Sequence, residues 1–109
     1  MSMIDNLQAM LDAGQDSALL RFTLGSQLLE AGQVADALPH LEAAVRQDPG
    51  YSAAWKFYGK ALHEAGQLVT ARDVYQQGIS AAEQQGDIQA VREMKVFLKR
   101  VEKALAAGY

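Results

Sequence analysis

Apolar residues recur every three or four positions through most of this chain, which is the spacing of one face of an α-helix. Four such stripes lie in residues 17–31, 33–47, 52–65 and 68–84, and two more lie at the two ends of the chain. The central stripes are Leu20, Leu24, Leu28 and Ala31; Leu38, Leu41, Ala44 and Val45; Trp55, Tyr58, Leu62 and Ala65; and Ala71, Val74, Tyr75, Gly78 and Ile79. The pattern predicts an all-α fold of about six helices.

Glycines punctuate these stripes in two ways. Five of them divide the chain into stretches of helix length and are expected to close helices, where glycine supplies a left-handed residue. These are Gly14, Gly32, Gly50, Gly66 and Gly86. Gly25, Gly59 and Gly78 instead fall inside the predicted helices, where glycine costs about 1 kcal/mol relative to alanine. We expect a neighbouring helix to approach closely at these three positions.

The chain also repeats itself with an offset of 34 residues. The tetrapeptide EAGQ occurs at residues 30–33 and again at 64–67, and Gly25, Leu28 and Ala37 fall on Gly59, Leu62 and Ala71. A fixed period that matches small and large residues is typical of helical-repeat proteins. EAGQ is therefore interpreted as the turn between the two helices of one repeat.

These positions resemble the tetratricopeptide repeat family, whose 34-residue unit carries a W-x-x-L-G-x-x-Y … A-x-x-x-F … P pattern. The matching residues are Leu24, Gly25, Leu28, Ala37, Leu41 and Pro49, and then Trp55, Tyr58, Gly59, Leu62, Ala71 and Tyr75. The resemblance implies antiparallel helix pairs stacked into a short right-handed α-superhelix. Sel1-like and related two-helix repeats are the alternative.

On this basis residues 1–109 form a single domain with two full repeats, at residues 18–51 and 52–85. Residues 1–15 are interpreted as the last helix of a degenerate repeat, and residues 87–107 as a capping helix, because Glu93 stands where Gly59 stood. Glu83 replaces the closing proline of the second repeat. This predicts that its second helix continues towards Gln85.

The composition and the missing motifs argue against several classes of function. Thirteen acidic and ten basic residues give a net charge of −3, so nucleic acid is not an expected partner. No membrane span, basic signal sequence or cysteine is present, and the cytoplasm is the expected location. His40 and His63 lie in different helices without a second ligand, and the catalytic and nucleotide-binding motifs are missing. We therefore expect neither an enzyme nor a bound metal or cofactor.

The resemblance implies that the first helix of each repeat lines an inner groove that binds a peptide or partner protein. The residues expected in that groove are Phe22, Ser26, Leu29, Lys56, Phe57, Lys60, His63 and Phe97. The phenylalanines are candidate apolar anchors, and Lys56, Lys60 and His63 would suit an acidic partner. The alternatives are that the phenylalanines belong to the core and that the lysines are merely solvated.

The function predicted from the sequence is thus a non-catalytic protein-interaction module, and the alternative is a subunit that self-assembles as a homodimer. Some co-chaperones of the family clamp a carboxylate with two asparagines, two lysines and an arginine. In this chain only Lys56 and Lys60 have a suitable charge at those places. A receptor for chaperone tails is therefore not expected.

Overall fold

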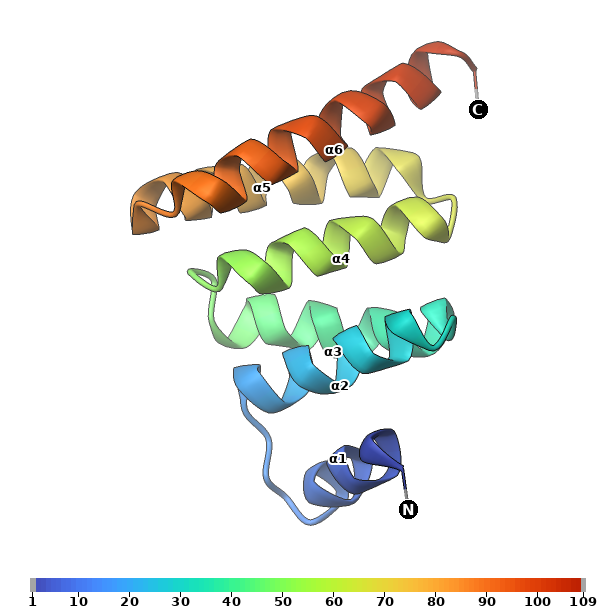
Figure 1. The fold of residues 1–109 in the computed structure, drawn as a ribbon, viewed down its shortest axis with the longest axis vertical. Helices are drawn as coiled ribbons and strands as arrows, with labels where there is room; N and C mark the ends of the chain where they lie inside the picture. The colour runs from blue at the N-terminus through green and yellow to red at the C-terminus, as the bar shows by residue number, and fades with distance from the viewer. Residues whose placement is uncertain (1, 109) are drawn as a thin grey trace.

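The computed structural model describes residues 2–108, and in that range it contains six α-helices and no strand. The helices are α1 (Met3–Asp12), α2 (Ala18–Glu30), α3 (Val34–Gln47), α4 (Ser52–Glu64), α5 (Leu68–Gln85) and α6 (Ile88–Ala106). Figure 1 shows them stacked in chain order along the long axis of the molecule. The long α5 ends at Gln85, as the missing proline of the second repeat predicts.

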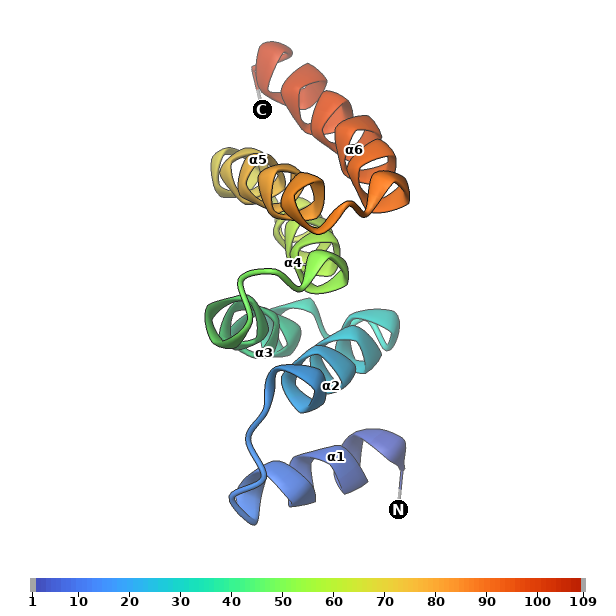
Figure 2. The same cartoon turned by 90° about the vertical axis from the view of Figure 1, so that its left-hand side faces the viewer.

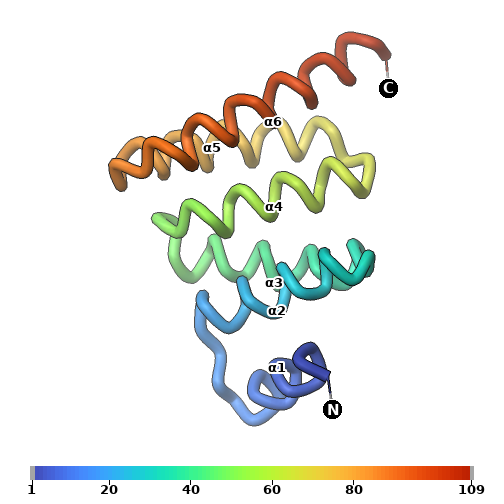
Figure 3. The backbone as a smooth tube through the Cα atoms, in the orientation of Figure 1, coloured from blue at the N-terminus to red at the C-terminus, as the bar shows by residue number. Residues whose placement is uncertain are grey.

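Successive helices run in opposite directions, so the chain zigzags up the stack, as the tube in Figure 3 shows. The closest neighbours are α2 with α3, α4 with α5, and α5 with α6, whereas α1 contacts only α2. Viewed from the side, α3 and α5 form one layer, and α2 and α6 lie on the opposite side of the stack (Figure 2). The body measures 43 × 31 × 18 Å. Helix α4 contacts both α2 and α6, so these three helices form the face opposite α3 and α5, which we call the inner face.

The repeated EAGQ tetrapeptide ends α2 and α4 with the same hydrogen bonds. Gly32 and Gly66 have φ angles of 79° and 77°, a left-handed conformation that favours glycine. The backbone N–H of Gln33 donates to the carbonyl of Leu28, and the N–H of Gln67 donates to that of Leu62, both at 2.9 Å. Together with the i→i+3 bonds of the glycines, these bonds form a Schellman motif. EAGQ is therefore a helix-ending signal.

Gly50 does not close a helix, and that prediction is wrong. The helix before it, α3, ends at Gln47, and Asp48 is extended, with φ −138° and ψ 87°. Pro49 explains the early end, because the ring of a proline disfavours the α conformation of the preceding residue. Gly50 is not among the glycines with positive φ.

The core forms where the mid-helix glycines admit a neighbouring helix. A Cβ atom added to Gly25 would lie 2.7 Å from Cγ of Leu41, and one added to Gly59 would lie 2.4 Å from Cε1 of Tyr75. Added to Gly78, it would lie 2.6 Å from Cβ of Trp55. Each distance is far shorter than an ordinary carbon contact. These three glycines therefore let the helices pack, as the sequence predicts.

A polar network holds the segment between α1 and α2 against the stack. The Arg21 guanidinium donates two hydrogen bonds of 2.9 Å to the Asp16 carboxylate, and Gln47 donates a third of 2.8 Å. These bonds, with that from Arg21 the strongest, hold the pKa of Asp16 well below its usual range. Arg21 also lies 3.1 Å from Nδ1 of His40, and burial, followed by this guanidinium, lowers the pKa of His40.

Candidate partner-binding groove

Aromatic pairs join α2 to α4 and α5 to α6. The ring of Phe22 on α2 lies 5.0 Å from the ring of Tyr51 and 5.4 Å edge-to-face from that of Phe57 on α4. On α6, the ring of Phe97 lies 6.0 Å from that of Tyr75. The three phenylalanines are half-buried, so each contributes to packing and also presents an edge to the inner face.

A recess of about 130 Å³ opens between α4 and α6 on this face. It is lined by Lys56, Phe57, Lys60, Glu93 and Phe97. Four of these five are residues that the sequence predicts for the groove. An apolar cavity of about 150 Å³ holds a benzene ring, so this open recess of about 130 Å³ can accept a slightly smaller apolar side chain.

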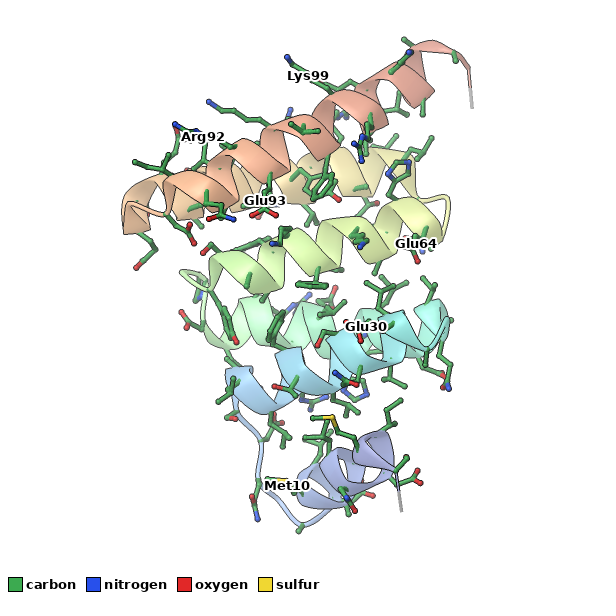
Figure 4. All side chains as sticks on the ribbon, in the orientation of Figure 1. Met10, Glu30, Glu64, Arg92, Glu93 and Lys99 are labelled. Atoms are coloured by element: carbon green, nitrogen blue, oxygen red, sulfur yellow. The ribbon has the colours of Figure 1, made fainter. Side chains whose placement is uncertain are left out.

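The charges beside the recess are not those expected from the sequence. Nζ of Lys56 is 3.1 Å from Oε2 of Glu93 and lies 5.6 Å from the centre of the Phe57 ring. Figure 4 shows Glu93 between α6 and α4. Within residues 2–108, Lys60 is exposed and forms no ion pair. Glu93 therefore neutralises one lysine of the predicted basic stripe and leaves the other available to a partner.

The remaining residues predicted for the groove, Ser26, His63 and Leu29, differ in how far they are buried. Ser26 is half-buried, and its hydroxyl donates to the carbonyl of Thr23. His63 is half-buried near the end of α4. Leu29 is only 7% exposed and packs in the core with Ala61 of α4. Leu29 therefore belongs to the core and presents little surface to a partner.

Two contributors to the site are not among the predicted residues. Glu93 is visible in the sequence as a break in the repeat, since it falls 34 residues after Gly59, but its contact with Lys56 depends on how α4 and α6 pack. Tyr51 precedes α4 and is placed by the turn at Asp48 and Pro49. Only the tertiary arrangement brings it against Phe22.

The described residues place no group of three His, Cys, Asp or Glu side chains together in a way that could hold a metal ion. Within the same range, no helix has the length and apolar character needed to cross a membrane.

One pair of polar side chains behind this face is structural. The Tyr58 hydroxyl donates to the Glu42 carboxylate at 3.1 Å. Burial, followed by that carboxylate, raises the pKa of Tyr58 to about 12.

The fold and the inner face define a short helical-repeat protein in which first helices line one surface and second helices pack behind them. A family model described as the tetratricopeptide repeat matches residues 28–94. The chain belongs to the tetratricopeptide repeat family. Proteins of this family are generally interaction modules without catalytic activity.

Relatives and solved structures agree with this assignment. The chain is 49% identical over 102 residues to the TPR repeat-containing protein PA0015 of Pseudomonas aeruginosa, covering 94% of this chain and 97% of that protein. The solution structure of protein BPP2914 from Bordetella parapertussis has a TM-score of 0.84 and 44% identity, covering 99% and 94% of the two chains. A 34% match to the mouse protein O-mannosyl-transferase TMTC1 covers 79% of this chain and 9% of that protein.

Peptide-binding architecture is represented among the structural neighbours. The first TPR of Spaghetti (RPAP3), solved with the HSP90 peptide SRMEEVD, has a TM-score of 0.81 and 21% identity, covering 94% of this chain and 77% of that chain. At that identity the likeness concerns the fold.

Proposed function

We propose that this protein is a non-catalytic interaction module that binds a peptide segment of a partner protein on the inner face formed by α2, α4 and α6. The observation that carries the proposal is the recess between Phe57 and Phe97, with the exposed Lys60 at its edge. A cytoplasmic location and a partner other than nucleic acid belong to the same proposal.

The lining of the recess suggests which side chains a bound peptide would place in it. An apolar or aromatic side chain entering between Phe57 and Phe97 leaves water and gains stacking contacts. A neighbouring Asp or Glu of the peptide is attracted to Lys60, whose charge is not met by an acidic group in the described chain. Lys56 contributes less, because Glu93 already accepts from its ammonium group. The preferred segment is therefore apolar with one acidic neighbour.

The family fold supports this proposal without supplying the partner. The first TPR of Spaghetti is bound to the HSP90 peptide on a similar fold, which supports peptide binding as the proposed role. The carboxylate clamp known from co-chaperones is not expected here. Phe22, Ser26, Ala53 and Phe57 stand where most of its polar residues would be needed.

Selection from a phage-displayed library of random peptides tests the proposal. We expect the enriched sequences to combine one aromatic or long aliphatic residue with Asp or Glu. Fluorescence anisotropy with a selected peptide then compares wild type with Lys60→Glu and Phe57→Ala. Each substitution should weaken binding by about tenfold, the equivalent of about 1.4 kcal/mol.

Lys103→Glu is the matched control, since it makes the same charge change on α6 outside the recess. It should leave the affinity within about twofold of wild type. Circular dichroism must show that Phe57→Ala remains folded, because Phe57 packs on Phe22. The inner-face assignment is wrong if Lys60→Glu and Lys103→Glu weaken binding equally, or if no peptide is enriched over an unrelated protein.

A further inference from the structure

The outer face of α6 carries a row of cations that the proposed groove does not use. Arg92, Lys95, Lys99 and Lys103 are exposed, and within residues 2–108 none of them forms an ion pair. In Figure 4, Arg92 and Lys99 lie along the edge of α6 that faces away from α4. Val96, on the same helical face, is 49% exposed. This surface combines positive charge with apolar area.

The charge of the chain is divided between α6 and the rest. Residues 88–106 contain five basic and two acidic residues, a net charge of +3, whereas residues 1–87 contain five basic and eleven acidic residues, a net charge of −6. An acidic surface is therefore attracted to α6, and another copy of this same chain offers one.

Two hollows lie at opposite ends of the α5–α6 pair, and the cations line the first of them. One, of about 460 Å³, is lined by Ile88, Val91, Arg92 and Lys95 together with Ala82, Glu83, Gly86 and Asp87 at the end of α5 and in the following turn. The other, of about 330 Å³, is lined by Val69 and Leu105 together with neighbouring residues at the start of α5. Ile88 and Val69 are 64% and 54% exposed. The outer side of this helix pair can thus receive apolar side chains.

At the other end of the stack, α1 presents apolar residues where other helices of the array bury theirs. Met3 and Met10 are 55% and 41% exposed. The residues 34 positions later, Ala37 and Ala44 on α3, are fully buried against their neighbours. Asp5 and Asp12 lie on the exposed part of α1, which has no basic residue. Because α1 contacts only α2, its outer face has no partner in the described chain.

We propose that α1 of one copy docks on the outer face of α6 of another, so that copies of this chain associate head to tail. Met3 and Met10 share one face of α1 and lie about 10 Å apart along it, so they pack together on Val96 and on the hollow beside Ile88 and Val91. The net charge of −6 on residues 1–87 is attracted to the cations of α6. The two contacting surfaces differ, so each added copy leaves a free α6, and the association is open-ended. A single helix pair buries less than the roughly 1,200 Å² of a stable interface, so the association is weak and depends on concentration.

Sedimentation velocity of the 109-residue chain, from about 10 µM to about 1 mM, tests this proposal in the weak-interface range. At low salt the weight-average mass should rise from the 11.8 kDa monomer past that of a dimer. In 1 M NaCl, where the screening length is about 3 Å, the mass should return towards the monomer. A wild-type chain that stays monomeric at 1 mM, or that stops at two copies, overturns the proposal.

Two variants with one blocked end each give a sharper test. Met10→Lys with Asp12→Lys makes α1 cationic, whereas Arg92→Gln with Lys99→Gln removes charge from α6. Each variant alone should remain monomeric, and an equimolar mixture should form a heterodimer and nothing larger, because only one complementary pair of ends remains. Lys60→Glu, in the groove, should assemble like wild type. Variants that self-associate like wild type, or a mixture that stays monomeric, refute the head-to-tail contact.

Discussion

The substitution Gly59→Ala tests how tightly α4 and α5 must approach each other. The added Cβ would lie 2.4 Å from Cε1 of Tyr75 and 2.7 Å from its Cδ1 and Cζ. Tyr75 is only 1% exposed, and its ring packs among buried side chains from α4, α5 and α6. A rigid, enclosed ring cannot move aside without displacing the helices that hold it. The methyl group must therefore push the two helices apart.

Two opposing effects set the magnitude of this change. In an open helical position, replacing glycine by alanine stabilises the helix by about 1 kcal/mol. Overpacking a filled core costs about 1–3 kcal/mol, and a contact this far inside the usual carbon spacing of about 3.5–4.0 Å belongs at the upper end. The net loss is about 2 kcal/mol. For a domain of this size it lowers the unfolding midpoint by roughly 10 °C.

Urea unfolding measures the effect with two signals. Circular dichroism reports all six helices, while the fluorescence of Trp55 reports the region where α4 packs on Gly78. The two transitions must coincide for a single free energy of unfolding to apply, because repeat proteins can unfold in parts. Ser80→Ala, at an exposed position of α5, is the control and should not destabilise. A Gly59→Ala variant as stable as wild type would refute the close approach.

Three further predictions concern the core, the polar network and the groove. Leu24→Ala should lower the free energy of unfolding by about 2–5 kcal/mol in urea titrations, because Leu24 is fully buried, and a loss below about 1 kcal/mol would contradict its role. Burial and Arg21 lower the pKa of His40 from 6.5, so the unfolded state binds more protons than the folded state. The free energy of unfolding should therefore fall as the pH drops from 7 towards 5. Urea titrations at several pH values should show a flatter dependence for His40→Gln. Glu93→Gln removes the partly exposed ion pair with Lys56 and should cost less than about 1 kcal/mol, a difference that should shrink in 1 M NaCl.

The helices and their close contacts could be predicted because they follow from local rules repeated along the chain. The 34-residue offset aligns Gly25 with Gly59, and in the structure each of these glycines admits a large side chain from the following helix. Helical periodicity selects the buried stripe, and the sequence EAGQ encodes its own turn through backbone hydrogen bonds. None of these features requires knowledge of distant neighbours.

The edges of the groove could not be predicted in the same way. Leu29 lies beside Leu28 on α2, at the boundary between the core stripe and the inner face. Periodicity places such a residue on a helix, but whether it is covered depends on the surrounding helices, and here Leu29 lies in a core cluster to which α1, α3 and α4 contribute. Phe57 and Phe97 are both among the residues predicted for the groove, and both line the recess. Their separation across the recess depends on the angle between α4 and α6, which the sequence pattern does not specify.

The break at Glu93 joins the cap and the groove in one physical argument. In the two full repeats this position is Gly25 or Gly59, because the second helix of the pair presses against it. Within the described residues no helix follows α6, so none packs against Glu93 as α5 packs against Gly59, and nothing there requires a glycine. The glutamate instead reaches α4 and pairs with Lys56. Because no helix follows α6 in the described residues, Glu93 has room for a long side chain, and the cations on the outer face of α6 stay exposed.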